Sequence, residues 1–555
     1  ERNGEKGVTM AMDNQERNLA VQNIRNNDKN VTWKGAAVGD TEETRRLKEN
    51  FGLIAPRALV YSVFYAFCMY RNGSGVTFPF FVAGSLWFFC SSFIRLGITL
   101  KKGSCYYMIA MLLLGISTFC TDDGFLHFFN KLGIFLLLMG LLLKQFYDTS
   151  KWQLGKYIGS IFLLFFASFG ELGRPFSDGS AYRKGREKKV NSRVWYFGAG
   201  LLIGLPLLLV VALLLASADA VFRQMTDRMF QNVSWGGIFQ ILFRICLLFF
   251  ASYALVAYLC KKRIREEITD LSRGEPILAI TVTGLLTLLY LFFSGIQIAG
   301  LFLGQLSLPE GYTYAMYARE GFFQLLAVSL LNLGIVLFSM RFFRKSSGLK
   351  VVLTVMSFCT FVMIASSAMR MIMYIRYYYL TYLRILVLWA LVVLAFLFAG
   401  VVIHILREDF PLFRYHMAVV TVLYLALSFA QPDFLIAKVN VGNVVSERAE
   451  EKGFFLEEEA YQDYAYLRGL SADAASVLVP WLEELGYETE AFFAEDAVEY
   501  AMEHAAWIWE DGSWAASNSQ AGFGYYWLRK LQLRTENFGI RTYNVSRHRA
   551  LNSFR

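Results

Sequence analysis

The feature that most constrains this chain is a series of apolar blocks, each about as long as a membrane-spanning helix. Such a helix needs roughly 20 mostly apolar residues, because each residue advances about 1.5 Å through a hydrocarbon core about 30 Å thick. Of the 555 residues, 56% are hydrophobic and only 18% are charged, whereas about a quarter are charged in a soluble chain. The sequence therefore predicts an all-α polytopic transmembrane helix bundle and excludes a soluble multidomain enzyme.

Eleven blocks are long enough to span a bilayer. They lie at about 54–70, 77–97, 104–120, 125–143, 195–217, 237–260, 277–304, 322–340, 351–369, 385–405 and 415–430. A twelfth block at 157–169 is shorter, a length more typical of interfacial, re-entrant or buried helices. We expect eleven spans, with twelve as the alternative, and the short block in or dipping into one membrane face.

The basic residues predict the orientation. With eleven spans and the N-terminus inside, the inside loops carry 24 Lys and Arg residues and the outside loops carry eight. Cytoplasmic loops are enriched in Lys and Arg, so we expect a protein of the cytoplasmic (inner) membrane whose C-terminal region lies outside. A basic cluster is expected to rest on anionic lipid headgroups rather than nucleic acid; it consists of Arg183, Lys184, Arg186, Lys188, Lys189 and Arg193.

Composition divides the chain into three regions. Residues 1–50 are polar and predict a loosely ordered tail, 51–430 form the transmembrane region, and 431–555 read as a small helical domain outside the membrane. In the third region, 447–511 carry 18 Asp and Glu against three Lys and Arg, whereas 512–555 carry seven Lys and Arg against one Glu. The two parts could pair with each other, or each could form a solvated charged surface; the sequence leaves both possibilities open.

The sequence has no signature of a known catalytic or metal centre. Phosphate-loop, H-E-x-x-H, G-x-S-x-G and paired C-x-x-C patterns are absent, and the five histidines are scattered. The seven cysteines lie in or beside apolar blocks, which is typical of small core residues. We therefore expect a non-enzymatic protein without a cofactor or a metal site.

Ionisable residues at membrane depth are the strongest functional signal, because they are unfavourable in lipid and usually face a bundle interior or water. Arg244 lies eight positions into the span 237–260, where its side chain could also snorkel to the surface. We predict a ligand site that comprises Asp219, Arg244, Arg319, Glu320, Arg370 and Tyr374. Gln297 and Asn332 add uncharged polar groups deeper in the membrane.

Two interpretations of this group remain open. If the residues converge, they form an aromatic-rimmed cavity that opens outward and suits an anionic or zwitterionic ligand. Otherwise they form ion pairs and hydrogen bonds that fix the helix register. The leading hypothesis is binding or transport of a small solute or lipid. The alternatives are a sensor or accessory subunit of a membrane complex with an unknown partner, and a membrane enzyme acting on lipid or glycan that uses Asp219 and Glu320.

Several segments resemble an uncharacterised bacterial membrane family, the domain-of-unknown-function group DUF-4153 and DUF-4173. The resemblance rests on five stretches, at 213–222, 309–324, 431–440, 463–474 and 543–550. It implies a multi-pass bacterial protein and brings no activity, substrate or catalytic residue. Two residues depart from the expected pattern, Met316 in the place of an acidic residue and Tyr379 in the place of a glycine.

Overall fold

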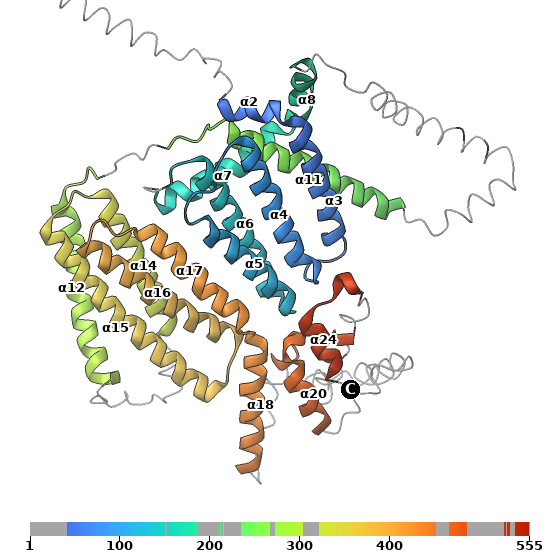
Figure 1. Cartoon of the computed structure of the whole chain (residues 1–555). Coiled ribbons are helices and arrows are strands. Elements are labelled where there is room, and N and C mark those ends of the chain that lie inside the picture. The colour runs from blue at the N-terminus through green and yellow to red at the C-terminus, as the bar shows by residue number, and fades with distance from the viewer. Residues whose placement is uncertain are drawn as a thin grey trace, which may run out of the picture.

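The computed structural model describes residues 41–149, 152–185, 211, 215, 235–266, 272–302, 321–450, 466–484, 527–528, 530–532 and 539–553. Within these ranges the regular structure is helical, apart from one β-bridge between Gly274 and Phe343. The all-α helix bundle expected from the apolar blocks is confirmed (Figure 1).

A first helix group is formed by the N-terminal half of the chain. It contains α2 (Glu42–Glu49), α3 (Phe51–Met69), α4 (Thr77–Leu96), α5 (Ser104–Cys120), α6 (Gly124–Phe146), α7 (Leu154–Ser168), η1 (Phe169–Glu171), α8 (Arg174–Gly185) and α11 (Trp235–Cys260). Aromatic side chains fill its core, and Phe88, Phe93, Trp152 and Tyr253 are all buried. This group therefore has an interior of its own.

A second helix group follows in the chain. It contains α12 (Pro276–Gln297), the π-helical turn η2 (Ile298–Phe302), α14 (Phe322–Phe342), α15 (Ser347–Tyr378), α16 (Tyr382–Leu406) and α17 (Leu412–Phe429). The long helix α15 packs against α12, α14 and α16. Helix α17 packs on both α16 and α5, so it joins the two groups, which lie side by side in Figure 1.

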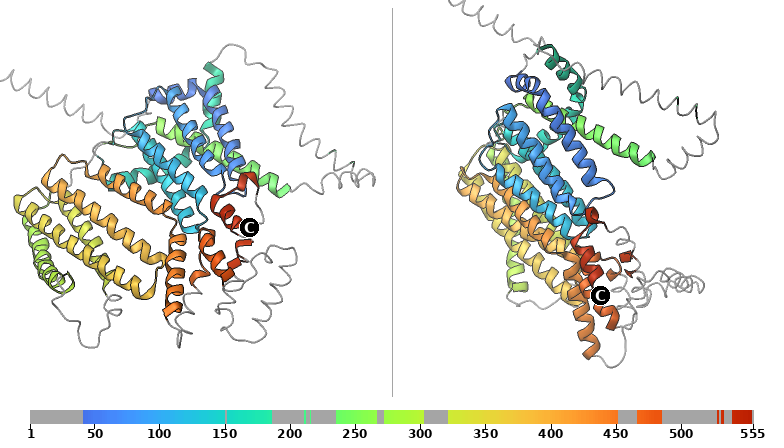
Figure 2. Two further views of the ribbon diagram at one scale, coloured as in Figure 1. Left: turned by 60° about the horizontal axis from the view of Figure 1, so that its bottom comes forward. Right: turned by 45° about the vertical axis from the view of Figure 1, so that its right-hand side comes forward.

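The described C-terminal segments form a third cluster. It contains α18 (Pro432–Glu450), η3 (Ala472–Ala474), α20 (Ala475–Glu484), η5 (Ile540–Thr542) and α24 (Val545–Asn552). Buried Ile436, Leu478, Trp481, Trp527 and Ala550 form its core. Figure 2 shows these orange and red segments gathered at one end of the spanning helices.

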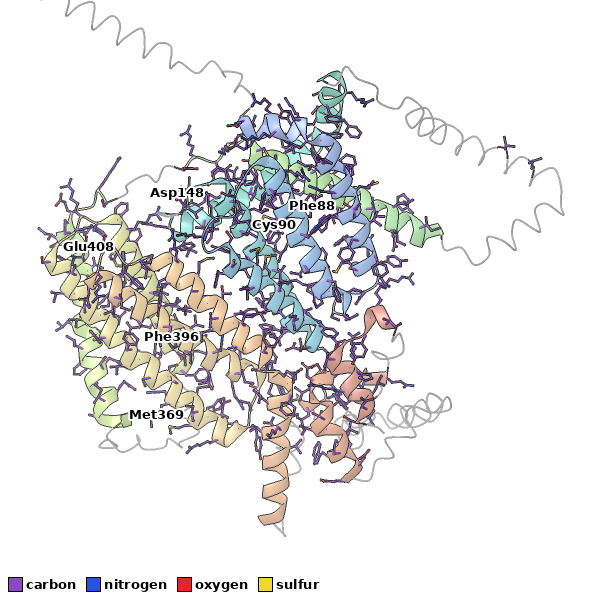
Figure 3. All side chains as sticks on the ribbon, viewed as in Figure 1. Phe88, Cys90, Asp148, Met369, Phe396 and Glu408 are labelled. Carbon is purple, nitrogen blue, oxygen red and sulfur yellow. The ribbon has the colours of Figure 1, made fainter. Side chains whose placement is uncertain are left out.

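The loops define two ends of the bundle. The upper end holds 97–103, 147–149, 261–266, 343–346 and 407–411, and the lower end holds 70–76, 121–123, 379–381 and 430–431. Figure 3 labels Asp148 and Glu408 near the upper end and Met369 near the lower end. The C-terminal cluster lies against the lower end, where the backbone N–H of Val76 donates to the carbonyl oxygen of Tyr543 at 2.7 Å.

Ten of the eleven expected spans fall on described helices: α3, α4, α5, α6, α11, α12, α14, α15, α16 and α17. The expected span 195–217 lies outside the described residues. By length and composition, ten helical segments of the described chain could cross a membrane, and these include Leu154–Glu171 but not α5, which has 17 residues. The chain is therefore multi-pass. The segment 154–171 is the one candidate span of the described chain that the sequence analysis did not expect to cross.

Both ends of α7 lie at the upper end of the bundle. Before α7, the Trp152 ring lies 6.1 Å from that of Tyr147, whose hydroxyl accepts from the backbone N–H of Ile264 at 3.5 Å. After it, Glu171 pairs with Lys261. Since the chain leaves and returns at one end, α7 runs along that end, as the charge pattern predicts, although with η1 it has 18 residues and is longer than expected.

The exposed side of α7 is apolar. Phe162, Phe166 and Phe169 are all more than half exposed, whereas Tyr157 and Leu164 are buried against the bundle. A helix at a membrane surface is stabilised by burying such a side at the boundary between headgroups and acyl chains.

The end of the polar N-terminal tail differs from the expectation. Residues 1–40 lie outside the described residues, but the basic run falls in helix α2, which is ordered. Leu47 is fully buried, and the guanidinium of Arg46 donates to the carbonyl oxygen of Leu96 at 3.0 Å. An ion pair of Glu43 with Lys262 at 2.7 Å and a bond from the Thr41 hydroxyl to the carbonyl oxygen of Cys260 add to the contacts that hold this short helix.

We expect the Lys261→Met variant to lose about 1–3 kcal/mol of unfolding free energy, because it removes a counter-charge from the buried carboxylate of Glu171. The double variant Lys261→Met/Glu171→Gln should recover most of the loss. Equilibrium denaturation in mixed micelles measures both.

Lys345→Met is the matched control, because its ion pair with Glu408 is exposed. Solvent screens this pair, so its loss should change the unfolding free energy much less than Lys261→Met does. A double variant as unstable as the single one would show that Lys261 stabilises the upper end without neutralising Glu171.

Candidate functional site at the lower end of the bundle

Three of the six predicted site residues lie in the described chain. Arg244 lies on α11, and Arg370 and Tyr374 lie on α15. The other three, Asp219, Arg319 and Glu320, lie outside the described residues, so the predicted pair of Asp219 with Arg244 has no structural counterpart to report.

Arg244 lies apart from the other two. Its guanidinium carbon is 5.7 Å from the centre of the Tyr70 ring, at the C-terminal end of α3. This cation–π contact belongs to the first helix group, whereas α15 belongs to the second, and the two helices lie on different sides of the molecule in Figure 1. Arg244 and Arg370 therefore do not share one cavity.

Arg370 lies inside the second group. Its side chain is 8% exposed, and Nη2 donates to Oε1 of Gln297 on α12 at 3.3 Å. The same oxygen accepts from the hydroxyl of Ser366 at 2.6 Å. On the other side, a Cβ placed on Gly321 would lie 3.1 Å from Nη1 of Arg370, and this glycine has a left-handed φ of +94°. The guanidinium is thus held between α12 and the start of α14.

Aromatic rings surround Tyr374, one turn closer to the lower end. The Tyr374 ring lies 6.1 Å from the Phe322 ring and 4.7 Å from the Tyr378 ring. The guanidinium of Arg384 stacks on Tyr374 at 4.4 Å. The cation in this aromatic group is therefore Arg384, which was not among the predicted site residues.

Above Arg370, buried polar side chains continue along the interface of α12, α14 and α15. We call this set the polar seam; its members are Thr283, Thr287, Ser294, Gln297, Ser329, Asn332, Thr360, Ser366 and Arg370. The amide of Asn332 donates to Thr360 Oγ1 at 3.0 Å. Its Oδ1 atom is buried without a hydrogen-bond partner within the described part of the chain. The seam therefore unites Arg370 with Gln297 and Asn332, the deeper polar groups noted in the sequence.

A second polar cluster joins the C-terminal segments to the lower-end loops. The carboxylate of Asp473 accepts from the Thr121 hydroxyl and, at 2.9 Å, from the backbone N–H of Asp122. The side chain of Asp122 in turn pairs with Arg547 at 2.7 Å. Asn544 donates to the carbonyl oxygens of Thr121 at 2.9 Å and Ser74 at 3.1 Å.

The neighbouring carboxylates complete this lower-end interface, which we define as Thr121, Asp122, Asp123, Asp433, Asp473, Asn544 and Arg547. Asp123 caps α6 through the backbone N–H of Phe125 at 2.8 Å and accepts from the Tyr382 hydroxyl at 2.6 Å. Asp433 accepts from the backbone N–H of Ser471 at 2.8 Å. Four buried carboxylates thus belong to this interface, and Arg547 pairs with one of them, Asp122.

Burial and crowding make the ionised acids unfavourable here. Burial, with the nearby Asp123 carboxylate as the next cause, raises the pKa of Asp433 to about 6. Burial likewise raises the pKa of Asp473, against hydrogen bonds from Ser546 and Thr121 that lower it. Among the described residues, no group of three or more His, Cys, Asp or Glu side chains is arranged to hold a metal ion, so the carboxylates act here as hydrogen-bond acceptors.

The sequence analysis missed this interface, although the sequence contains two signals for it. Asp122 and Asp123 stand together in the short loop between two apolar blocks, and Asp433 directly follows the last block. In addition, three of the segments that carry the family resemblance, 431–440, 463–474 and 543–550, supply Asp433, Asp473 and Arg547. These segments are separate in the sequence and come together only in the folded structure.

Docking of the C-terminal segments should strengthen as pH falls. A folded-state pKa of about 6 for Asp433 lies above the usual value of an aspartate, so protonation favours the docked state, and this stability is lost as pH rises through about 6. We expect larger protection factors for the amides of 539–553 at pH 5 than at pH 7.5, measured by hydrogen–deuterium exchange with each rate divided into the intrinsic chemical rate at that pH.

Asp433→Asn should make the protection of 539–553 less dependent on pH. It should keep the bond from the backbone N–H of Ser471, because an amide oxygen accepts this hydrogen bond as a carboxylate oxygen does. The control Glu408→Gln changes an exposed upper-end acid whose pKa is lowered to about 2 by Lys345 and Lys350. Equal pH dependence in wild type and Asp433→Asn would contradict the assignment to Asp433.

Comparisons with known proteins agree with the resemblance. Neither the curated proteins nor the solved structures contain a match to this chain. The family model described as "Domain of unknown function (DUF4153)" matches residues 108–480. This range takes in α5 to α20, and with them the polar seam and the carboxylates of the lower-end interface. Since the match covers more than half of the sequence, this chain belongs to the DUF4153 family of proteins of unknown function.

Proposed function

We propose that this membrane protein binds or transports a small anionic or zwitterionic solute along the polar seam, with Arg370 as the cation that selects it. The role is non-enzymatic. The observation that carries the proposal is the burial of the Arg370 guanidinium among Gln297 and Ser366, inside a group of otherwise apolar helices.

The chemistry of the seam suits such a solute. A guanidinium offers donors in a planar fork that matches carboxylate and phosphate groups. Gln297 and Asn332 add amide groups that can donate or accept, and Oδ1 of Asn332 is already buried without a partner among the described residues. Buried polar groups without partners often mark sites for water or ligand.

The competing explanation is that these residues only fix helix packing. Several hydroxyls support it, because Thr283, Thr287 and Ser329 bond backbone carbonyls four residues back on their own helices. Polar residues also join helices in membranes. Arg370 distinguishes the two explanations, since a cation requires far more compensation in lipid than a hydroxyl does.

The experiment measures chemical access to the seam. In a background without the seven native cysteines, Ser366→Cys is treated with impermeant thiol reagents of similar size, one anionic and one cationic. We expect labelling, with the anionic reagent favoured by roughly tenfold, because a buried cation concentrates anions. Adding Arg370→Gln should remove this preference.

Ser62→Cys is the matched control, because Ser62 is a fully buried serine of the first helix group that bonds the carbonyl oxygen of Ala58 at 2.7 Å. It should stay unlabelled. If Ser366→Cys is as protected as Ser62→Cys from both sides of sealed vesicles, the seam is closed packing and the proposal fails.

A second candidate is a sensor or accessory subunit, favoured by the docking of the C-terminal segments through Asp473 and Arg547. A sensor domain needs such a connection to its membrane part. Crosslinking followed by purification should then recover a stoichiometric partner, and a chain that is recovered alone would count against this candidate. The enzyme alternative relied on Asp219 and Glu320, which lie outside the described residues, so no observation favours it.

The proposal includes an orientation. The upper end would face the cytoplasm, because it carries most of the loop Lys and Arg residues, and the lower-end interface would face outward. Arg183, on α8 at the upper end, would then lie at the level of anionic lipid headgroups. The other five members of that basic cluster lie outside the described residues or have side chains that are not described.

A further inference from the structure

A groove opens on the lipid side of the second helix group, between α12 and α14. Its volume is about 560 Å³, within the range of small-molecule sites. The lining residues are Leu278, Ala279, Val282, Thr283, Leu331, Gly334, Ile335, Phe338, Ser339 and Phe343. Leu278 and Phe338 form exposed walls, whereas Ala279 and Ser339 are buried at the floor. The groove therefore opens toward the bilayer.

The lining accepts only an apolar occupant. Almost all of it is hydrocarbon, and the hydroxyl of Thr283 already donates to the carbonyl oxygen of Ala279 at 2.6 Å. Gly334 keeps the groove deep, since a Cβ placed there would meet no atom within 4 Å. The shape and chemistry are those of a slot for a hydrocarbon chain.

The upper end of the groove is closed and basic. Phe343 closes it, and the β-bridge holds Phe343 in place through the backbone N–H of Gly274, which donates to the carbonyl oxygen of Phe342 at 3.0 Å. Arg344 follows directly, with a side chain that is 64% exposed. The upper-end segments 272–276, 341–350 and 407–411 carry six basic residues and three acidic ones.

We infer that this groove holds an acyl chain of an anionic phospholipid, whose phosphate is bound by Arg344 at the upper end. The site lies on the outer surface of the helices and shares only Thr283 with the polar seam, whose Arg370, Gln297 and Asn332 do not line it, so it does not depend on the proposed function. The occupant follows from two features together, an apolar slot that faces lipid and an excess of basic residues where that slot ends at the headgroup level.

Arg344 is able to take this role. Its ion pair with Glu275 spans 3.3 Å between two exposed side chains, so water screens it and it holds the guanidinium weakly. A guanidinium can bind a phosphate through two parallel hydrogen bonds. Lys345 and Lys350 both pair with the single carboxylate of Glu408. The upper end beside the groove therefore carries excess positive charge.

The experiment measures lipid retention by the purified full chain. The protein is delipidated in detergent, incubated with phosphatidylglycerol or phosphatidylcholine, purified again and analysed by native mass spectrometry. We expect the wild type to retain phosphatidylglycerol severalfold better than phosphatidylcholine. Glycerol 3-phosphate should not compete, because it lacks the acyl chain that occupies the groove.

Gly334→Leu fills the groove without a clash and should abolish retention. Gly284→Leu is its matched control, because a Cβ placed on Gly284, which also lies in a helix, would meet no atom within 4 Å, and this glycine does not line the groove. Arg344→Gln should remove the preference for phosphatidylglycerol, whereas Arg45→Gln, an exposed upper-end arginine paired with Glu49, should keep it.

Three outcomes would overturn the inference. The first is a wild-type protein that retains neither lipid, as expected if protein fills the groove. The second is equal retention by Gly334→Leu and Gly284→Leu. The third is equal retention of the two phospholipids by wild type, which would show a hydrocarbon slot without a headgroup site.

Discussion

The constraint on which this structure depends is that a polar group inside a membrane must find its partner within the protein. The described helices meet it in three ways, with exceptions such as Oδ1 of Asn332. Hydroxyls such as Thr283 bond their own backbone, amides such as Asn332 bond a neighbouring helix, and the Arg370 guanidinium bonds Gln297. The same constraint places Asp122 and Asp473 at the ends of helices, where backbone N–H groups are available. Buried polar side chains therefore lie along the interfaces between helices and at the ends of the bundle.

The two helix groups meet through polar contacts as well as apolar ones. The hydroxyls of Ser117 on α5 and Ser428 on α17 lie 2.6 Å apart, and both Tyr424 and Ser428 donate to Oδ1 of Asn130 at 2.8 Å. Asn130 is fully buried on α6. One amide thus connects the first helix group to α17, close to the lower-end interface.

The sequence predicted those parts of the structure that depend on local composition. Apolar length predicted nine of the ten described segments that could cross a membrane, and it also counted α5, which has 17 residues. The Lys and Arg distribution predicted that α7 does not cross, although with η1 its length alone would allow it. The sequence did not predict that the basic run at Arg46 is helical, because the contacts that hold this helix, such as the Glu43–Lys262 ion pair and the bond from Arg46 to Leu96, come from distant parts of the chain. The predicted site also grouped Arg244 with Arg370, which lie in different helix groups. Membrane depth can be inferred from a sequence, but which helices pack against each other cannot. The lower-end interface was missed for the same reason, because it joins residues that only the fold brings together.

The lower-end interface also joins residues that lie far apart in the chain. Asp122 and Arg547 are separated by 425 positions, and Asn544 bonds Ser74 across 470. Contacts of such long range close late in folding. During synthesis, the carbonyl oxygens of Ser74 and Thr121 therefore lack their Asn544 donor until the segment 539–553 has been made. A chain cut before Asn544 would contain every described spanning helix and still leave the loops at 72–76 and 121–123 without these partners, so the lower-end interface forms only after all the described spanning helices have been synthesised.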